Sequence, residues 1–214
     1  MRKPVGWSSF DVVRRVKKLI PGSKVGHAGT LDPFADGVLL VCTGRETRSI
    51  AALVDAPKEY RGRLRLGFTT DTLDISGVVT ETRALAPCDP EQIRTAARRF
   101  VGELQQVPPS FSAIHVDGQR LYKLARAGVE KIPAPRPVTI HSLEVLAIGT
   151  CWIDFTVCCS KGTYIRALAR DWARELGTVG FLSHLTRTRI GSYRLEESLE
   201  VTALAQYLQS ESSR

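Results

Sequence analysis

Apolar residues at helical spacing predict a first helix near the amino terminus. Ser8 or Ser9 can serve as its N-cap, because a serine hydroxyl accepts a hydrogen bond from a free N–H at the start of a helix. Pro21-Gly22 ends the pattern. The stripe expected to face the core consists of Phe10, Val13, Val16 and Ile20.

After this helix the chain predicts a glycine-rich loop over 22–37, a short strand over 38–41 and a second helix over 46–54. From Glu59 to Phe68 apolar and polar residues alternate with the period of two of a half-buried strand. Its polar face carries Arg61, Arg63 and Arg65, which either border a binding groove or are simply solvated.

The middle of the chain is expected to form a capped helix followed by a basic insertion. Asp89, Pro90 and Gln92 form a capping-box pattern at the start of a helix that runs to Val101, which is expected to face inward. The Asp117-Gly118 pair predicts a hairpin or a strand-to-helix corner. A short basic helix over 119–127 and a proline-rich connector follow.

The last third predicts strands over 138–148, 152–158 and 183–193, with a helix over 163–176 that Gly177 ends. Ser198 is expected to cap a final helix. Strands and helices do not alternate regularly, so the pattern favours an α+β sheet with helices packed on it over a doubly wound parallel fold.

Composition narrows the class of protein without deciding its function. The 214 residues carry a net charge of +8, which permits a polyanionic partner but is common in other proteins. The five cysteines lack zinc-site spacing, and several of them, in apolar stretches, are expected to be small buried hydrophobes. No signal peptide or long apolar run is found, so we expect a cytoplasmic protein with no membrane contact.

The most unusual segment is the loop that contains Asp32. Its glycines allow close approach of the backbone, and Asp32 stands directly before Pro33. No Gly-Lys-Ser/Thr ends the loop, and it lacks dinucleotide-binding spacing. Alone, Asp32 would be interpreted as a helix N-cap, but a cap does not need His27, Gly29 and Thr30 before it.

Residues 26–39, Gly-His-Ala-Gly-Thr-Leu-Asp-Pro-Phe-Ala-Asp-Gly-Val-Leu, resemble the catalytic motif of the TruB/dyskerin family of pseudouridine synthases. Four further segments are similar to family motifs in the same order. They are residues 3–9 (Lys-Pro-Val-Gly-Trp-Ser-Ser), residues 58–74 with Lys58-Glu59-Tyr60 and Asp74, residues 160–171 with Ser160-Lys161-Gly162-Thr163-Tyr164-Ile165-Arg166, and residues 185–191 (Leu-Thr-Arg-Thr-Arg-Ile-Gly).

The resemblance implies a pseudouridine synthase fold: a mixed, largely antiparallel central sheet with helices on it and the active-site cleft across the sheet. It implies that the chain isomerises uridine 55 in the T-loop of tRNA, with an additional role in tRNA folding also open. No cofactor and no metal is expected. The partner is the T-arm of tRNA, and we expect a monomer that requires no protein partner.

The resemblance also assigns catalytic roles. Asp32 is the nucleophile, and attack on C6 of the base and attack on the anomeric carbon both stay open. A nucleophilic carboxylate must stay ionised, and Arg166 is the expected cationic neighbour that favours this form. Tyr60 is expected to stack on the flipped uracil and to take the C5 proton.

Substrate-binding roles follow from the same motifs, and His27 is expected to stack on or hydrogen-bond an unpaired nucleotide. The full set of expected substrate-binding residues is His27, Asp74, Tyr164, Lys3, Thr30 and Leu185. Expected phosphate contacts are Lys17, Lys18, Lys24, Arg120, Lys123 and Arg126.

We expect one catalytic domain over 1–210, with a basic insertion around 108–137 that either grips RNA or is a polar surface excursion. The strand that precedes the Lys-Pro motif in the family is not recognisable in this sequence. Neither is a C-terminal PUA-type RNA-binding domain. Phe111 and His115 replace the family's usual Tyr and Lys, and Ser8 replaces a usual Thr. Two alternatives remain: a guide-RNA-dependent, dyskerin-like synthase, and a tRNA-binding folding chaperone with secondary catalysis.

Overall fold

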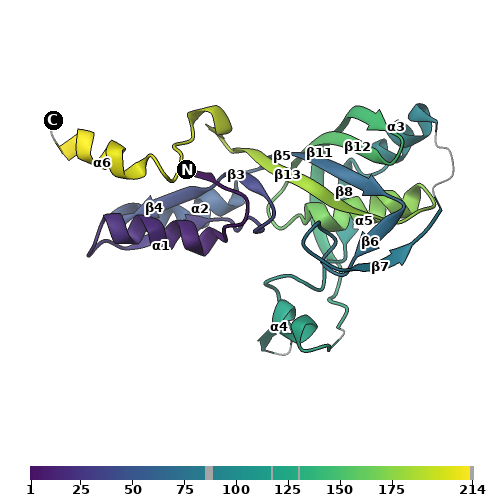
Figure 1. Ribbon diagram of the computed structural model, residues 1–214, viewed down its shortest axis with the longest axis horizontal. Coiled ribbons are helices and arrows are strands. Elements are labelled where there is room, and N and C mark those ends of the chain that lie inside the picture. Colours follow the sequence, from purple (N-terminus) through teal and green to yellow (C-terminus); the bar gives the residue numbers. More distant parts are fainter. Residues whose placement is uncertain (85–88, 117, 130, 213–214) are drawn as a thin grey trace. The chain divides into compact units, whose positions relative to one another are not determined.

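The computed structural model describes residues 1–84, 89–116, 118–129 and 131–212 (Figure 1). The chain divides into two compact units. Unit 1 comprises residues 1–61 and 185–214, and unit 2 comprises residues 62–184. Strands β5 (Lys58–Leu66) and β13 (Gly180–Ile190) each contribute residues to both units.

Unit 1 is built on short strands joined by loops and covered by helices. Its strands follow the order β1-β3-β13-β5, with β14 paired to β13, and β3 runs parallel to β13. Its remaining elements are β1 (Arg2–Lys3), α1 (Ser9–Leu19), β2 (Val25–Ala28), β3 (Asp36–Val38), β4 (Leu40–Thr43), a 3-10 helix (Gly44–Ser49), α2 (Ile50–Asp55), β14 (Tyr193–Arg194), a 3-10 helix (Leu195–Glu197) and α6 (Leu204–Ser212).

Unit 2 contains the long antiparallel strands. Its strand order is β13-β5-β12-β11-β8, and β11 pairs antiparallel with both β12 and β8. Its remaining elements are β6 (Phe68–Thr70), β7 (Val79–Thr82), α3 (Pro90–Arg98), β8 (Gly102–Gln106), β9 (His115–Val116), β10 (Gln119–Arg120), α4 (Leu121–Arg126), β11 (Arg136–Gly149), β12 (Trp152–Cys159) and α5 (Ile165–Glu175). The α+β prediction is confirmed.

Each unit has its own apolar core. In unit 1, Val12 and Val16 of α1 pack with Leu39, Val201 and Leu204. In unit 2, Phe155 of β12 and Trp172 of α5 are fully buried and meet edge to face, with ring centroids 5.7 Å apart. In the described ranges, no helix is long and apolar enough to cross a membrane.

Local capping signals correctly predicted two helix starts. Ser8 caps α1 in a capping box with Asp11, and Asp89 caps α3 with Gln92. The alternation along β5 is also confirmed, because Tyr60, Leu64 and Leu66 are buried on one face.

Other predictions were wrong where tertiary packing decided the outcome. Phe10 is 61% exposed, and Val12 takes its expected place in the core. Val101 is 46% exposed instead of buried. Ser198 ends a 3-10 helix and caps no α-helix, because α6 begins at Leu204.

The predicted loop over 22–37 contains a strand that the sequence pattern did not reveal. Strand β2 pairs antiparallel with β4, from Val25 opposite Thr43 to Ala28 opposite Leu40. Both α1 and α2 contact β2. A Cβ on Gly26 would lie 2.7 Å from Cδ1 of Ile50, so the glycine permits α2 to pack closely on this strand.

The basic insertion around 108–137 contains the predicted hairpin and the predicted short helix. Strands β9 and β10 pair antiparallel, so the hairpin exists, although residue 117 of its turn lies outside the described residues. Helix α4 follows, and Figure 1 shows it set apart from the sheet of unit 2. Cys42 and Cys159 are buried as expected, and Cys88 lies outside the described residues.

Candidate active site

The loop that carries Asp32 connects β2 to β3 in unit 1. Asp32 itself is half-buried, whereas its neighbours Leu31 and Ala35 are buried. Ser9 of α1 fixes Leu31 from both sides: its hydroxyl accepts from the Leu31 N–H at 2.9 Å and donates to the Leu31 carbonyl at 3.2 Å. The loop is therefore attached to the first helix directly beside the predicted nucleophile.

A buried guanidinium holds the same loop from the other side. Arg187 of β13 is 1% exposed. It donates to the carbonyl of Val38 at 2.7 Å, of Gly29 at 3.1 Å and of Thr30 at 3.3 Å. A buried cation is stable only when its donors are paired, so these three carbonyls and Arg187 fix each other's positions.

Two glycines make this arrangement possible. Gly29 has φ +87° and Gly37 has φ +113°, both in the region that favours glycine. A Cβ on Gly37 would lie 2.3 Å from the carbonyl oxygen of Arg187, with which it pairs in the parallel β3–β13 ladder. The glycines predicted for close backbone approach thus surround the loop that contains Asp32.

Lys3 is a second buried cation in unit 1. It is 0% exposed, and its ammonium donates to the carbonyls of Pro4 at 2.9 Å and Trp7 at 2.6 Å. Burial lowers the pKa of Lys3 to about 8, although the nearby carboxylates of Asp36 and Asp32 oppose the shift. Lys3 therefore lies near enough to Asp32 for the two charges to interact, in line with its predicted place beside the pocket.

His27 lies in β2, five residues before Asp32. Its Nδ1 atom is buried and has no hydrogen-bond partner among the described residues. Burial lowers the pKa of His27, and the positive charge of Arg187 lowers it further. Both effects favour the neutral imidazole.

The other predicted residues of unit 1 differ in exposure. Tyr60 of β5 is 8% exposed and Leu185 of β13 is 4% exposed. Thr30 is exposed at the surface, and its carbonyl is one of the acceptors of Arg187. A role for the Thr30 side chain stays a prediction.

In unit 2, Arg166 forms a buried ion pair with Asp74. Both residues are 4% exposed, and Nη1 of Arg166 lies 3.6 Å from Oδ2 of Asp74. The guanidinium also donates to the carbonyls of Thr72 at 2.7 Å and Phe111 at 3.0 Å. This burial excludes the interpretation of Arg166 as an ordinary surface arginine.

The turn between β6 and β7 fixes the position of the Asp74 carboxylate through hydrogen bonds. Its Oδ1 accepts from the Thr72 hydroxyl and the Ser76 N–H, both at 2.9 Å, and from the Ser76 hydroxyl. Leu73 holds φ +60°, so the turn carries backbone strain next to the ion pair. Asp74 is therefore held both by this turn and by its ion pair with Arg166.

Tyr164 is positioned through its backbone at the start of α5. The buried Gln106 accepts from the Tyr164 N–H at 2.8 Å and donates to the Tyr164 carbonyl at 3.1 Å. This two-point contact fixes the residue that precedes Arg166 by two positions. Sequence reasoning did not find Gln106, Ser9 or the function of Arg187, because the side chain of each binds backbone atoms of a distant segment.

One basic strand position is committed to the fold of unit 2. Nε and Nη2 of Arg63 donate to Asp154 at 2.6 and 2.8 Å, and its guanidinium lies 4.2 Å from the centroid of the Trp152 ring. The Arg63 side chain is 41% exposed, so this pair lies at a solvated surface, and a binding role for the basic face of β5 stays a prediction.

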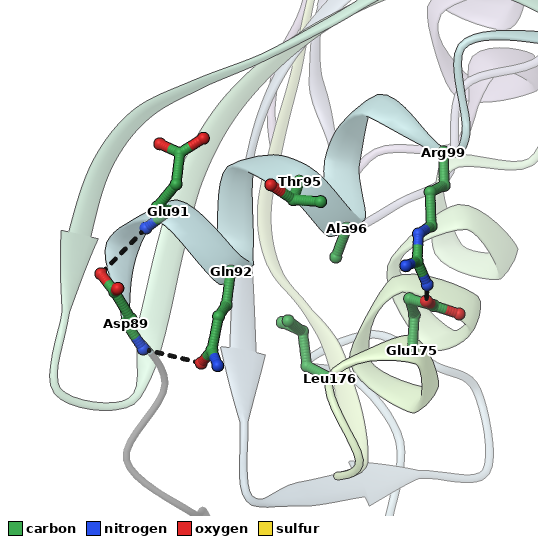
Figure 2. Close-up of a pocket in the computed structure, with 8 residues that line it drawn as sticks. All are labelled: Asp89, Glu91, Gln92, Thr95, Ala96, Arg99, Glu175 and Leu176. Carbon is green, nitrogen blue, oxygen red and sulfur yellow. Dashed lines mark hydrogen bonds and ion pairs between the residues drawn. The ribbon is translucent and has the colours of Figure 1, made fainter.

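One open cavity of unit 2 lies away from the predicted residues. It has a volume of about 480 Å³ and is lined by residues of α3 and α5. Figure 2 shows Asp89 bonded to the start of its own helix and Arg99 paired with Glu175, so its charged groups are already engaged. Among the described residues, no three His, Cys, Asp or Glu side chains gather to hold a metal ion.

The structure brings Lys3, Asp32 and Arg187 together in unit 1, and Arg166 and Asp74 together in unit 2. The pairing of Arg166 with Asp32 stays a prediction. The family model described as the TruB family pseudouridylate synthase N-terminal domain matches residues 17–165. The chain belongs to the TruB family.

Relatives of this TruB-family chain cover nearly all of it. It is 45% identical to a tRNA pseudouridine synthase B of Arthrobacter sp., over 97% of the chain and 70% of that relative. It is 41% identical to one of Flavobacterium johnsoniae, over 97% of the chain and 93% of the relative. The crystal structure of a Cbf5-Nop10-Gar1 complex contains a similar chain, with a TM-score of 0.76 and 29% identity, covering 100% of this chain and 55% of that one.

Replacing Arg187 by Met should lower the free energy of unfolding by about 3 kcal/mol or more, because the carbonyls of Gly29, Thr30 and Val38 lose the buried donor that they share. Arg189→Met, two residues along the same strand, removes a part-exposed ion pair with Glu59 and should cost less than about 1 kcal/mol. Urea unfolding measures both values. Equal losses would show that Arg187 does not hold the loop.

The lowered pKa of Lys3 predicts a specific pH dependence of stability. The folded protein releases this proton near pH 8, whereas the unfolded chain retains it up to the ordinary value of 10.5. Raising the pH through this window therefore favours the folded state. Between pH 8 and 10, wild type should gain about 1–2 kcal/mol relative to Lys3→Met in urea unfolding. A constant difference would contradict the burial of a charged Lys3.

Proposed function

We propose that this chain isomerises uridine 55 in the T-loop of tRNA to pseudouridine, with Asp32 as the nucleophile. The observation that carries the proposal is the immobilised loop: Asp32 lies within the segment matched by the family model, between backbone groups held by Ser9 and Arg187. A reacting carboxylate needs a fixed position to attack one atom of a bound nucleotide.

The reaction needs no redox partner. The bond from N1 of uracil to C1′ of the ribose breaks, and a bond from C5 to C1′ forms. The proton on C5 leaves, and N1 of the rotated base acquires a proton. Asp32 supplies the transient covalent bond, by attack on either C6 or C1′, and is regenerated at the end.

Tyr60 and the pair of Arg166 and Asp74 complete the proposed machinery. Tyr60 lies against the flipped base and takes the C5 proton late in the reaction. Arg166 is held rigidly by two carbonyls and one carboxylate, which suits a guanidinium that must keep a nearby carboxylate ionised. Tyr164, Lys3, Thr30 and Leu185 border the substrate.

The assignment of tRNA rests on the relatives, which carry the name tRNA pseudouridine synthase B. A stacked uridine must be extruded from the loop before it can react, at a cost of a few kcal/mol. The net charge of +8 supplies phosphate attraction, and His27 is the proposed contact with an unpaired base. Residues 1–210 act as the catalytic domain, with the excursion around 108–137 gripping the RNA.

The experiment that tests this function is primer extension after carbodiimide treatment of an unmodified tRNA transcript. The chain is incubated with the transcript without cofactor, guide RNA or second protein. A new stop in the T-loop supports the proposal. A stop elsewhere, or one that requires a guide RNA, would move the chain to a different activity.

Asp32→Asn should abolish pseudouridine formation while tRNA binding is retained, because the amide keeps the shape of the side chain but cannot act as the nucleophile. Primer extension and filter binding measure the two properties. Asp36→Asn is the matched control, since Asp36 accepts from Thr186 at 2.5 Å and pairs with Arg2. Turnover by the Asp32 variant would overturn the assignment.

Arg166→Lys should lower the single-turnover rate by about 100-fold, because an ammonium cannot reach two carbonyls and a carboxylate from one position. The control is Arg174→Lys on the same helix, whose side chain is 66% exposed and which should react at the wild-type rate. Equal rates for both variants would remove Arg166 from the mechanism.

A further inference from the structure

The outward face of α1 combines aromatic and basic side chains. Val12, Val13 and Val16 turn inward and are buried. The opposite side carries residues at spacings of three and four, which places them along one face of the helix. We call this set the α1 stripe; it consists of Trp7, which directly precedes the helix cap, and Phe10, Arg14, Arg15 and Lys18.

The stripe borders a hollow of unit 1. A cavity of about 360 Å³ is lined by Gly6, Trp7, Asp11, Arg14, Arg15 and Lys18. Asp11 is its acidic member, and it is occupied by the helix cap, because it accepts from the Ser8 N–H at 2.9 Å and the Ser8 hydroxyl at 2.6 Å. Three cationic side chains therefore line the hollow, and its one carboxylate is already hydrogen-bonded to Ser8.

Both aromatic members of the stripe are exposed. Phe10 is 61% exposed and Trp7 is 36% exposed. The guanidinium of Arg14 lies 5.2 Å from the centroid of the Phe10 ring, and Arg14 also pairs with Asp11 at 3.2 Å. Flat rings beside cations are the combination that stacks an unpaired base while its phosphates are neutralised.

The stripe begins beside the loop of Asp32. The Gly6 N–H donates to the carbonyl of Pro33 at 2.8 Å. Trp7 accepts from the buried Lys3 through its carbonyl, and Ser9, two residues further, holds Leu31. An RNA strand that delivers a nucleotide to Asp32 consequently passes within reach of this hollow.

We propose that the α1 stripe binds the tRNA loop nucleotides that flank the target uridine, with one unpaired base on Trp7 and the phosphates on Arg15 and Lys18. The proposal rests on the function given above. Charge selects this occupant, because three cations and one capped acid complement a polyanion and not a neutral protein surface.

The test measures binding of an unmodified tRNA transcript at several salt concentrations. Arg15→Gln with Lys18→Gln should weaken binding about tenfold and reduce the slope of log Kd against log salt by about one to two. Trp7→Ala should weaken binding about tenfold through lost stacking, whereas Trp7→Phe should retain most of it.

The matched control is Arg94→Gln with Arg98→Gln, which removes two exposed positive charges from α3. Equal weakening by both double variants would reduce the effect to net charge and overturn the proposal. Wild-type RNA affinity in the stripe variants, with loss of self-association or of a protein contact, would overturn it in favour of a protein-binding face.

The two proposals fail in different ways. A wild-type chain that leaves the transcript unmodified refutes the proposed function. A wild-type chain that modifies the T-loop, with stripe variants that bind and react as wild type does, refutes the stripe alone. Thermal melting of each variant confirms that a weaker affinity does not come from unfolding.

Discussion

The position of the proposed nucleophile depends on a buried guanidinium that binds backbone carbonyls. Arg187 comes from β13, more than 150 residues after the loop, and closes the loop onto the sheet through Gly29, Thr30 and Val38. Without such contacts a glycine-rich loop would sample many conformations, and the entropy lost on reaction would raise the barrier. The contacts that form when unit 1 folds already order the loop, so this entropy is lost before a substrate binds.

Unit 2 uses the same principle for its own cation. Arg166 is buried, bonded to carbonyls of Thr72 and Phe111, and paired with Asp74, whose carboxylate is itself held by Thr72 and Ser76. In each unit a guanidinium with several fixed acceptors has one geometry, which a flexible ammonium could not maintain. Rigid charges of this kind suit a reaction in which a single carboxylate must remain ionised and aligned.

Features that depend on neighbours in sequence were predictable. The caps at Ser8 and Asp89 are of this kind, and so is the alternation of β5. Phe10 was predicted to be buried because its spacing fits a core stripe, but the core of unit 1 accepts Val12 instead. Strand β2 escaped notice because its pairing with β4 is a tertiary property, and a Gly-His-Ala sequence shows no alternation.

Motifs contain the residues proposed to react, Asp32, Tyr60 and Arg166, but they do not reveal what holds these residues in place. Arg187 also stands in a motif, yet it lies on a strand where a charged residue is expected to face solvent. Its burial follows from the parallel pairing of β13 with β3 at Gly37, which no local pattern encodes. Ser9 and Gln106 were missed for the same reason, since each binds the backbone of a distant segment.

The most direct test of this account is native-state amide hydrogen exchange of the loop in the unaltered protein. The Leu31 amide donates to the Ser9 hydroxyl of α1, that of Ala35 to the Asp32 carbonyl within the loop, and that of Leu39 to the Met1 carbonyl. If buried Arg187 fixes the loop, these amides should open with a free energy close to that of the β2–β4 pair in the same unit. Rapid exchange of the loop amides beside a protected β2–β4 pair would contradict the claim that Asp32 is held in place before substrate binds.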